Sequence, residues 1–421
     1  MYNYISLTFD YCLLEDKCVC PQISKDNKNM WWTGYSETIE DIYAYNKWCN
    51  ILVHTTNWYN NQSIHFNWYN YTIKREVGNS DRVFYDAFVS ADTDAEAEKI
   101  LYSYNNDLFQ KTLQCIEQIN SERCKQWLLP ITYNFIHTPT SWFTIDASYM
   151  LAQYLRVPLI STIRVNEKEL QTIETFKLPH SSIILKKDLE TKQKSDLVIC
   201  KNKVILEDTL LVNNSAIEIN NDLFLPRFDI SKLDAKNSNN ILYVGRLSYE
   251  KWFDRFVELV KTINKNENKF NFYICGSSLW LDPKLWELIQ ELQSYNNVFL
   301  LWHISMEQLQ DMYLKCWYVI IPSRSEAYCR VILEWLYYWC YIFATNVGSA
   351  SSQITSNKYG KVIENSDASI INIINYLSEK TNIDYTAIHT YWSTFNNTHN
   401  IDMKLNVIAD FLISKTPNDK A

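Results

Sequence analysis

Short apolar runs alternate with helical segments through the second half of the chain, and this alternation constrains the fold most. The runs are apolar at every residue rather than at every second one, which is typical of strands buried on both faces of a parallel sheet. They lie at 241–244, 272–274, 298–301, 318–321 and 341–344. After the first run, apolar residues recur on one helical face at Phe253, Phe256, Val257, Val260 and Ile263. The repeated order predicts a doubly wound α/β sheet with its ligand at the carboxyl ends of the strands.

The first half of the chain carries a weaker form of the same pattern. Candidate strands lie at 5–9, 51–54, 135–137, 159–163 and 196–199, with a helical segment at 146–156. Residues 57–85 are rich in Asn, Tyr and Trp and fit no period, which predicts a long insertion or loop. The polar segment 207–240 is interpreted as the connection between two domains.

The length of 421 residues suits two domains, because single cores stop growing near about 250–300 residues. We therefore expect an N-terminal Rossmann-like domain at 1–206 and a second Rossmann-like domain at 207–390. Residues 391–421 are predicted to be a helical tail that packs back on the first domain.

Charge and cysteine content exclude several functions. Residues 1–205 hold 21 basic and 24 acidic side chains and the remainder hold 19 and 24, so neither half has a nucleic-acid footprint. The 11 cysteines include no CxxC pair, which indicates reduced thiols in a cytoplasmic protein. No apolar stretch reaches about 18 residues, so no transmembrane segment is expected. Peripheral membrane contact stays open.

Glycine is scarce and tryptophan abundant. Only 6 residues are Gly and 15 are Trp, whereas glycine usually makes up about 7% of a protein. Tight turns and phosphate-binding loops usually depend on glycine, so any nucleotide site must form with few of them.

A strand–turn–helix segment at Gly245 is a candidate anion site. Gly245 and Arg246 follow a predicted strand, and Lys251 lies just before a predicted helix. Free backbone N–H groups and the helix dipole attract anions there, and the two cations could neutralise a diphosphate. The alternative is the solvated start of an ordinary surface helix.

A second segment of this kind runs from Ser323 to Glu334. Glu326 is expected in the loop after a strand and Glu334 two turns into the following helix, whose first turn lies near Cys329 and Arg330. One carboxylate can accept hydrogen bonds from sugar hydroxyls and the other from a ribose diol, while the first helical amides can hold a phosphate. The alternative is a pair of unrelated surface glutamates.

Several motifs in order resemble a known family. GRLSYEK, FYICGSS, the Glu326-x7-Glu334 stretch, ATNVGSASSQI and YGKVIE are similar to the donor half of retaining GT-B glycosyltransferases of glycosyltransferase family 4 (glycosyl transferases group 1). The first half agrees more loosely, through IHTPTSWFTIDASYMLAQYLRVPLIST and KSDLVIC. The resemblance implies two Rossmann-like domains that face each other across a cleft.

The resemblance also implies a reaction and the residues that carry it. A sugar would move with retention of configuration from a nucleoside diphosphate, UDP favoured, to a glycan, protein or small-molecule acceptor, without a metal or cofactor. Arg246 and Lys251 would hold the diphosphate, Glu326 the donor sugar and Glu334 the ribose. His137 would lie beside the sugar; its alternative is a structural histidine at a strand end. The implied donor set is Gly245, Arg246, Lys251, Glu326, Cys329, Arg330 and Glu334.

The chain departs from this family at positions where glycine or another small residue is usual. They are Cys18, Cys20, Trp252, Trp302, Ala327, Trp335 and Trp339. A tryptophan at such a position must find a large space. Trp335 and Trp339, four residues apart, are predicted to pack on one helix face. Cys18 and Cys20 could also be metal or redox ligands, although small side chains in a loop are the favoured interpretation.

The departures keep other functions open. One is a glycosyltransferase-like protein with impaired catalysis that acts as a sugar-nucleotide sensor or partner subunit, and another is a GT-B epimerase or phosphorylase. Asp92-Thr-Asp94 is similar to the metal-binding DxD of a different glycosyltransferase class. Its acidic surroundings favour a solvated helix start instead.

Overall fold

The computed structural model divides the chain into two compact units. One comprises Met1–Asn220 with Ile401–Ala421, and the other Asn221–Asn400. The structure describes residues 4–7, 14–15, 22–23, 51–56, 64–68, 71–76, 81–139, 142–171, 177–220, 230–266, 269–276, 283–302, 304–326, 329–378, 386–391 and 401–415.

The first unit is built on an eight-stranded sheet with the order β10-β9-β8-β7-β1-β4-β6-β5. Its strands are β1 (Tyr4–Leu7), β4 (Ile51–Thr56), β5 (Ile64–Trp68), β6 (Tyr71–Glu76), β7 (Phe135–Thr138), β8 (Leu159–Ile163), β9 (Leu197–Cys200) and β10 (Ala216–Glu218). All neighbours pair in parallel except β5 and β6. A separate antiparallel pair joins β2 (Leu14–Glu15) and β3 (Gln22–Ile23).

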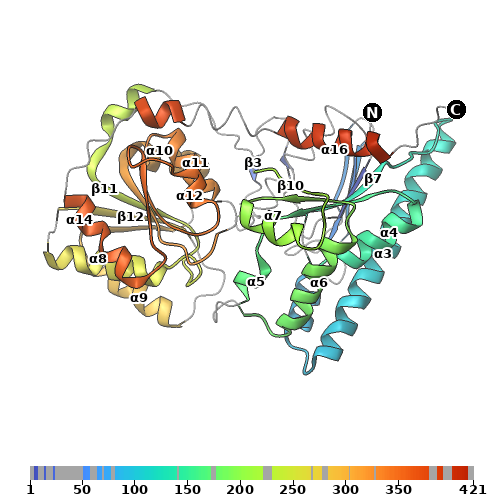
Figure 1. Cartoon of the computed structure of the whole chain (residues 1–421), viewed down its shortest axis with the longest axis horizontal. Coiled ribbons are helices and arrows are strands. Elements are labelled where there is room, and N and C mark those ends of the chain that lie inside the picture. Colours follow the sequence, from blue (N-terminus) through green and yellow to red (C-terminus); the bar gives the residue numbers. More distant parts are fainter. Residues whose placement is uncertain are drawn as a thin grey trace. The chain divides into compact units, whose positions relative to one another are not determined.

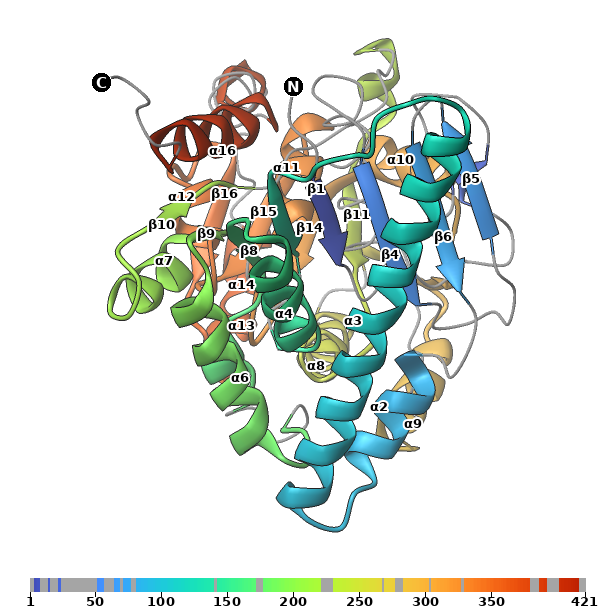
Figure 2. The same ribbon diagram turned by 90° about the vertical axis from the view of Figure 1, so that its right-hand side faces the viewer.

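Helices pack against this first sheet, and Figure 2 shows α3, α4 and α6 in front of its strands. The helices of this unit are α2 (Asp81–Val89), α3 (Asp94–Lys125), α4 (Ile145–Leu155), α5 (Glu167–Leu170), α6 (Ser181–Lys194), α7 (Lys203–Leu210) and α16 (Ile401–Lys415). The inner face of α4 is apolar, with Ile145, Ala147 and Leu151 fully buried in one cluster with Ile5 and Ile136 of the sheet. This burial is the main source of stability for an α/β layer.

Two expectations for the first half need correction. Residues 57–85 are not simply a loop, because they contain β5, β6 and the start of α2. Their aromatic and Thr residues have high strand propensity, and a hairpin at the sheet edge does not need a continuous apolar run. The segment 207–240 is not only a connection, because it includes the end of α7 and β10, and β10 pairs with β9. The first unit therefore extends to Asn220 rather than to 206.

The second unit contains six parallel strands in the order β13-β12-β11-β14-β15-β16. They are β11 (Asn237–Val244), β12 (Asn271–Cys275), β13 (Val298–Trp302), β14 (Cys316–Ile321), β15 (Tyr341–Thr345) and β16 (Gly360–Ile363). In chain order this is 3-2-1-4-5-6, the arrangement of dinucleotide-binding sheets. The predicted doubly wound architecture is confirmed. The order reverses between β11 and β14, where such sheets bind their ligands.

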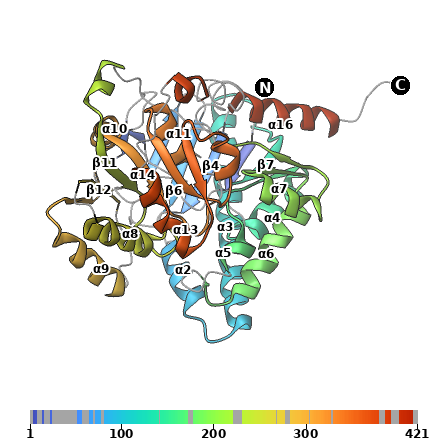
Figure 3. The ribbon, with the colours of Figure 1, turned by 60° about the vertical axis from the view of Figure 1, so that its left-hand side comes forward.

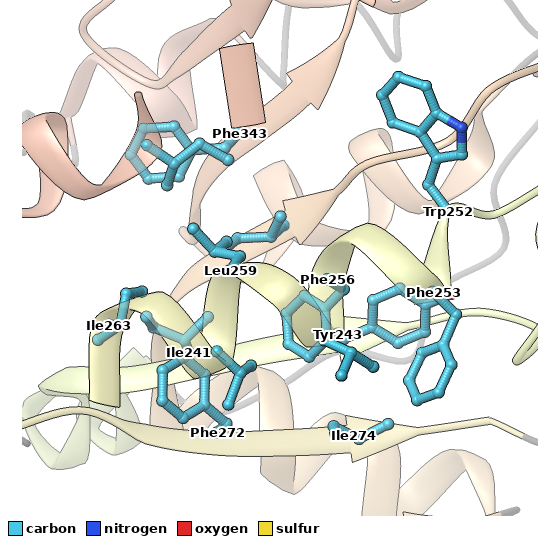
Figure 4. Close-up of a cluster of buried hydrophobic side chains, with 14 of the residues drawn as sticks. Ile241, Tyr243, Trp252, Phe253, Phe256, Leu259, Ile263, Phe272, Ile274 and Phe343 are labelled. Atoms are coloured by element: carbon cyan, nitrogen blue, oxygen red, sulfur yellow. The ribbon is translucent and has the colours of Figure 1, made fainter. Parts of the chain in front are cut away.

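Helices cover both faces of the second sheet, with α8 and α9 on one side and α10 and α11 on the other (Figures 1 and 3). The elements are η1 (Ile230–Ala235), α8 (Phe253–Asn266), α9 (Pro283–Gln293), α10 (Met306–Lys315), α11 (Arg330–Tyr337), α12 (Ala350–Gln353), α13 (Asp367–Ile371) and α14 (Ile373–Ser378). Figure 4 shows Phe253, Phe256 and Ile263 of α8 among side chains of β11 and β12. The helix face predicted from the apolar spacing is the buried one.

Several tight turns are made without glycine. Six non-glycine residues in the described part of the chain have left-handed backbone angles: Trp127, Arg156, His180, Trp252, Trp302 and Trp339. Three of them, at 252, 302 and 339, are positions where the sequence comparison with the family places a small residue. The φ angles there are 53°, 55° and 58°, a region that costs a non-glycine residue about 1–2 kcal/mol.

The ends of β11 and β12 approach each other closely at two glycines. A methyl group at Gly276 would overlap the carbonyl oxygen of Gly245. The same group at Gly245 would meet only the Tyr243 side chain, whose hydroxyl oxygen is nearest at 3.5 Å. Gly276 is therefore required by packing, whereas Gly245 has room for a side chain.

Gly276→Ala is expected to lower the free energy of unfolding by about 2–3 kcal/mol, because the added methyl group must displace backbone atoms. Gly245→Ala, the matched control, is expected to change it by less than about 1 kcal/mol. Denaturant unfolding monitored by tryptophan fluorescence measures both. Equal stability of the two variants would contradict the close approach.

Candidate functional site

The candidate site lies in the second unit, where the strand order reverses. Gly245 follows β11, and residues 323–326 follow β14, its neighbour in the sheet. The backbone N–H of Arg324 donates to the Glu250 carbonyl at 2.8 Å, so the two loops are joined directly. Carboxyl ends of adjacent parallel strands form a shared edge, and this explains why two segments far apart in sequence meet.

An ion pair joins these loops. Lys251 Nζ lies 2.6 Å from Glu326 Oε1 and 3.7 Å from Glu250 Oε1. Ser323 Oγ donates to the same Glu326 oxygen at 2.6 Å. The side chains of Lys251 and Glu326 are only 18% and 14% exposed, so the pair is largely shielded from solvent. The structure thus brings together two of the residues predicted to bind the donor.

The electrostatics of this cluster keep Lys251 charged. Burial alone would lower the pKa of Lys251, but the carboxylates of Glu326 and Glu250 outweigh it and raise the pKa above its usual value. The ammonium therefore persists at every physiological pH. Any stability from the raised pKa is present below the ordinary lysine pKa and is lost only as the pH rises through the folded-state value.

Arg246 differs from Lys251 in its exposure. Its guanidinium is bonded to Glu250, but 54% of its side chain remains accessible. The turn that carries it is fixed from below, since the Tyr243 hydroxyl donates to the Arg246 carbonyl at 2.8 Å. Burial and the nearby Glu326 carboxylate raise the pKa of Tyr243 well above its ordinary value, so its hydroxyl remains a donor.

The remaining predicted donor residues lie in and just before α11. Cys329 is the N-cap residue of the helix and is 3% exposed, and burial raises the pKa of its thiol. Arg330 is the first helical residue. Glu334 is 2% exposed, and its Oε2 accepts a hydrogen bond from the Tyr313 hydroxyl at 3.1 Å. Glu334 therefore lies inside the fold, which argues against the alternative that it is a surface glutamate.

His137 is in the first unit, and its contacts are those of a structural histidine. It lies within β7, is 5% exposed, and its Nε2 is 2.9 Å from Thr162 Oγ1. Its ring also packs edge-on against Tyr4. These contacts favour the structural alternative, and the role beside the sugar stays a prediction.

The other sequence candidates have separate outcomes. Thr93 caps α3 by accepting from the Glu96 N–H, so the segment Asp92-Thr-Asp94 is the predicted helix start. Asp94 is bonded to His180 and Ser182. No cluster of three or more possible metal ligands occurs among the described residues. Cys18 and Cys20 lie outside them.

The tryptophans near α11 do not share a helix face. Trp335 is fully buried in the helix and packs edge-on against Tyr313. Trp339 follows the end of the helix at Tyr337 and lies against His389 instead. The predicted packing on one face is therefore wrong, because the helix ends before the second tryptophan.

Sequence reasoning assigned no role to Arg324 or Asp254. The guanidinium of Arg324 makes two parallel hydrogen bonds of 2.8 Å to the carboxylate of Asp254, in the first turn of α8. It also donates to the Tyr249 carbonyl. Neither residue stands out in the sequence, because their 70-residue separation becomes a contact only through the strand order.

Comparison with known proteins identifies the second unit. Residues 227–388 match the family model of glycosyl transferases group 1. The match lies within the second unit and covers less than half of the chain. An uncharacterised glycosyltransferase of Methanocaldococcus jannaschii is 28% identical over 179 residues, which are 40% of this chain and 46% of that protein. The gpi3 subunit of Schizosaccharomyces pombe phosphatidylinositol N-acetylglucosaminyltransferase is 27% identical over 169 residues, 38% of this chain and 36% of that protein. The chain spans less than half the length of either relative.

Solved structures extend the likeness in fold to both units of the chain. Sucrose-phosphate synthase of Thermosynechococcus elongatus aligns with a TM-score of 0.70 and 14% identity, over 99% of this chain and 100% of that one. Anabaena HepE in complex with UDP and glucose aligns with a TM-score of 0.64 and 14% identity, over 98% and 99%. The predicted GT-B fold, with two Rossmann-like domains, is confirmed. No helix among the described residues is long and apolar enough to cross a membrane.

The ion pair predicts a measurable coupling between the two loops. Lys251→Met leaves the Glu326 carboxylate without its cation, and Glu326→Gln leaves Lys251 without its closest anion. Each is expected to cost about 2 kcal/mol of unfolding free energy. The double variant should lose at least about 1 kcal/mol less than the sum of the two. Denaturant titration of the four proteins measures this cycle, and additive losses would mean that the pair contributes nothing.

Proposed function

We propose that this protein is a retaining glycosyltransferase of family 4 that transfers a sugar from a UDP-sugar to a glycan, protein or small-molecule acceptor. One observation carries the proposal. Two cations, Arg246 and Lys251, lie at the strand-order reversal of a dinucleotide-type sheet, each held by a carboxylate. The group 1 family match and the UDP complex of HepE support a UDP-sugar donor.

The site can bind a diphosphate without losing its internal contacts. Lys251 has three N–H donors and Arg246 has five, and each makes one close ion pair here, Lys251 with Glu326 and Arg246 with Glu250. Further donors can therefore turn to phosphate oxygens. The exposed Arg246 suits the outer part of the diphosphate, and the shielded Lys251 suits the oxygen on which charge develops. Fixed cations beside a leaving phosphate stabilise the transition state without a metal.

We assign the donor sugar to Glu326. Its Oε1 accepts from both Lys251 and Ser323, which fixes the carboxylate and leaves Oε2 as the acceptor for sugar hydroxyls. We assign the ribose to Glu334, whose carboxylate is oriented by Tyr313. Attack by the acceptor on the same face, with its proton passing to the departing phosphate, accounts for retention.

The mostly buried free thiols in the described residues suit a reducing compartment, and we assign the protein to the cytoplasm. The alternative, a sensor that binds the nucleotide without catalysis, has no observation in its favour beyond the bulky residues near the loops. Retention of both cations and of Glu326 supports the enzyme.

Nucleotide binding is the first test. UDP is expected to raise the melting temperature more than GDP or ADP, because the proposed donor is a UDP-sugar. A ligand present at about 100 times its Kd adds about 2.7 kcal/mol of stability. Differential scanning fluorimetry with each nucleotide measures this. Absence of a shift with all three would sink the proposed donor site.

Transfer is the second test, with matched lysine variants. Lys251→Ala is expected to abolish sugar release from the UDP-sugar, whereas Lys261→Ala, on the outer face of α8, should retain it. EDTA should leave the rate unchanged, and NMR of the product should show the donor's anomeric configuration. Nucleotide binding without release or transfer would favour the sensor, and an inverted product would exclude retention.

A further inference from the structure

Arg324 contacts the segment that carries Lys251 through both its side chain and its backbone. Its guanidinium forms the two-bond pair with Asp254 and reaches the Tyr249 carbonyl. Its backbone N–H donates to the Glu250 carbonyl at 2.8 Å. These partners lie on both sides of Lys251 in sequence, so Arg324 holds the segment that carries this lysine at two ends.

Arg324 also lies in the loop that carries the carboxylate of the site, between Ser323 and Glu326. Ser323, immediately before it, donates to Glu326 at 2.6 Å, and Glu326 follows two residues later. Asn365 donates to the Arg324 carbonyl at 3.3 Å and ties the loop to the chain beyond β16. A movement of Arg324 would therefore shift the lysine and the carboxylate relative to each other.

We propose that Arg324 is a positioning residue for the transfer reaction, and that its fork-shaped pairing with Asp254 sets the spacing of Lys251 and Glu326. The inference rests on the proposed function. A planar guanidinium with two parallel bonds fixes direction as well as distance, which a lysine cannot do. The side chains of Arg324 and Asp254 are 24% and 23% exposed, so the pair also has limited access to competing water.

Arg324→Lys keeps the charge and loses the fork, so we expect at least a tenfold lower kcat/KM, a weaker UDP affinity by calorimetry and a nearly unchanged Tm. Asp254→Asn should have the same effect, and the double variant should be no worse than either. The matched control is Arg123→Lys in the first unit, which should bind UDP normally. Parent protein without UDP binding would refute the proposed function itself. Normal UDP binding and kcat/KM in Arg324→Lys, with a parent that binds, would overturn the positioning role alone.

A different observation, the backbone angles of the tryptophans, carries a second inference. Four of the six left-handed non-glycine residues in the described part are tryptophans: Trp127, Trp252, Trp302 and Trp339. Asparagine and aspartate are the side chains that tolerate this region best, and bulky residues rarely adopt it. No conformational preference of tryptophan explains why it occurs at these positions.

Three of these tryptophans occupy the position that glycine takes in a Schellman turn. After α11, the Cys340 N–H donates to the Trp335 carbonyl and the Trp339 N–H to the Leu336 carbonyl. The same two bonds flank Trp127 after α3 and Trp252 before α8. In this turn the residue with positive φ is usually glycine.

Two of these side chains lie in surroundings that do not suit a tryptophan. Trp127 is 97% exposed. Trp252 is 3% exposed, but its indole N–H is buried without an acceptor in the described structure. The guanidinium of Arg255 is only 3.1 Å from the centre of its ring. Figure 4 shows Trp252 at the turn before α8, beyond the aromatic residues of the helix itself.

We infer that these four positions require glycine. The source organism would then translate their codon as glycine, although the printed sequence has tryptophan there. A codon whose meaning differs between genetic codes would put tryptophan at glycine positions throughout a chain. It would at once account for 6 glycines beside 15 tryptophans in 421 residues. Trp335 has a helical backbone and gives no such signal.

The test compares glycine and alanine at the same position. Trp127→Gly, at the 97% exposed position, is expected to raise Tm by about 2–4 °C over the parent, and Trp127→Ala to raise it less, because alanine keeps the left-handed strain. At position 252 both substitutions remove the same buried indole, so Trp252→Gly should have a higher Tm than Trp252→Ala. Trp142→Gly is the control: this buried tryptophan has no positive φ, and its removal should lower Tm. A lower Tm for Trp252→Gly than for Trp252→Ala would overturn the glycine requirement.

Peptide mass spectrometry of the protein purified from its source organism tests the codon directly. Masses that contain glycine at 127, 252, 302 and 339 are expected. Masses that contain tryptophan at these positions would overturn the reassignment, whatever the stability data show.

Discussion

The ion pair between Lys251 and Glu326 is the contact on which the candidate site depends. It joins the loop after β11 to the loop after β14, and it keeps one cation and one carboxylate in fixed positions with little solvent around them. Arg246, Glu250, Ser323 and Arg324 are arranged around this pair. The site therefore behaves as one electrostatic unit, in which a change to one member alters the electrostatic environment of the others.

The sequence predicts the second sheet well because its strands are buried on both faces, so their apolar runs are continuous. It predicts the edge of the first sheet poorly, since β5 and β6 form a hairpin in an aromatic, polar segment. The loops that carry Gly245 and Glu326 were predictable from the strand–turn–helix pattern. Their mutual contact was not, because strand order is a property of the whole sheet.

The same limit applies to individual residues. Lys251 and Glu326 could be proposed from the motifs, but the Arg324–Asp254 pair has no local signal. His137 is the opposite case. It stands out in the sequence as a candidate, but its partners in the structure, Thr162 and Tyr4, are those of a structural histidine. The family resemblance pointed to Trp252, Trp302 and Trp339 as unusual, and the backbone angles show that any side chain beyond glycine is strained in the turns that contain them.

The position of β11 at the centre of its sheet has a consequence for synthesis of the chain. Lys251 and Glu326 are 75 residues apart, with three strands, β12, β13 and β14, between them. Non-local pairing of this kind forms late, because the intervening chain must first be closed into a loop. A nascent chain that has been synthesised only as far as β13 lacks β14, so the edge of β11 next to Arg246 and Lys251 is still unpaired. The proposed nucleotide site can therefore be complete only after β14 has docked.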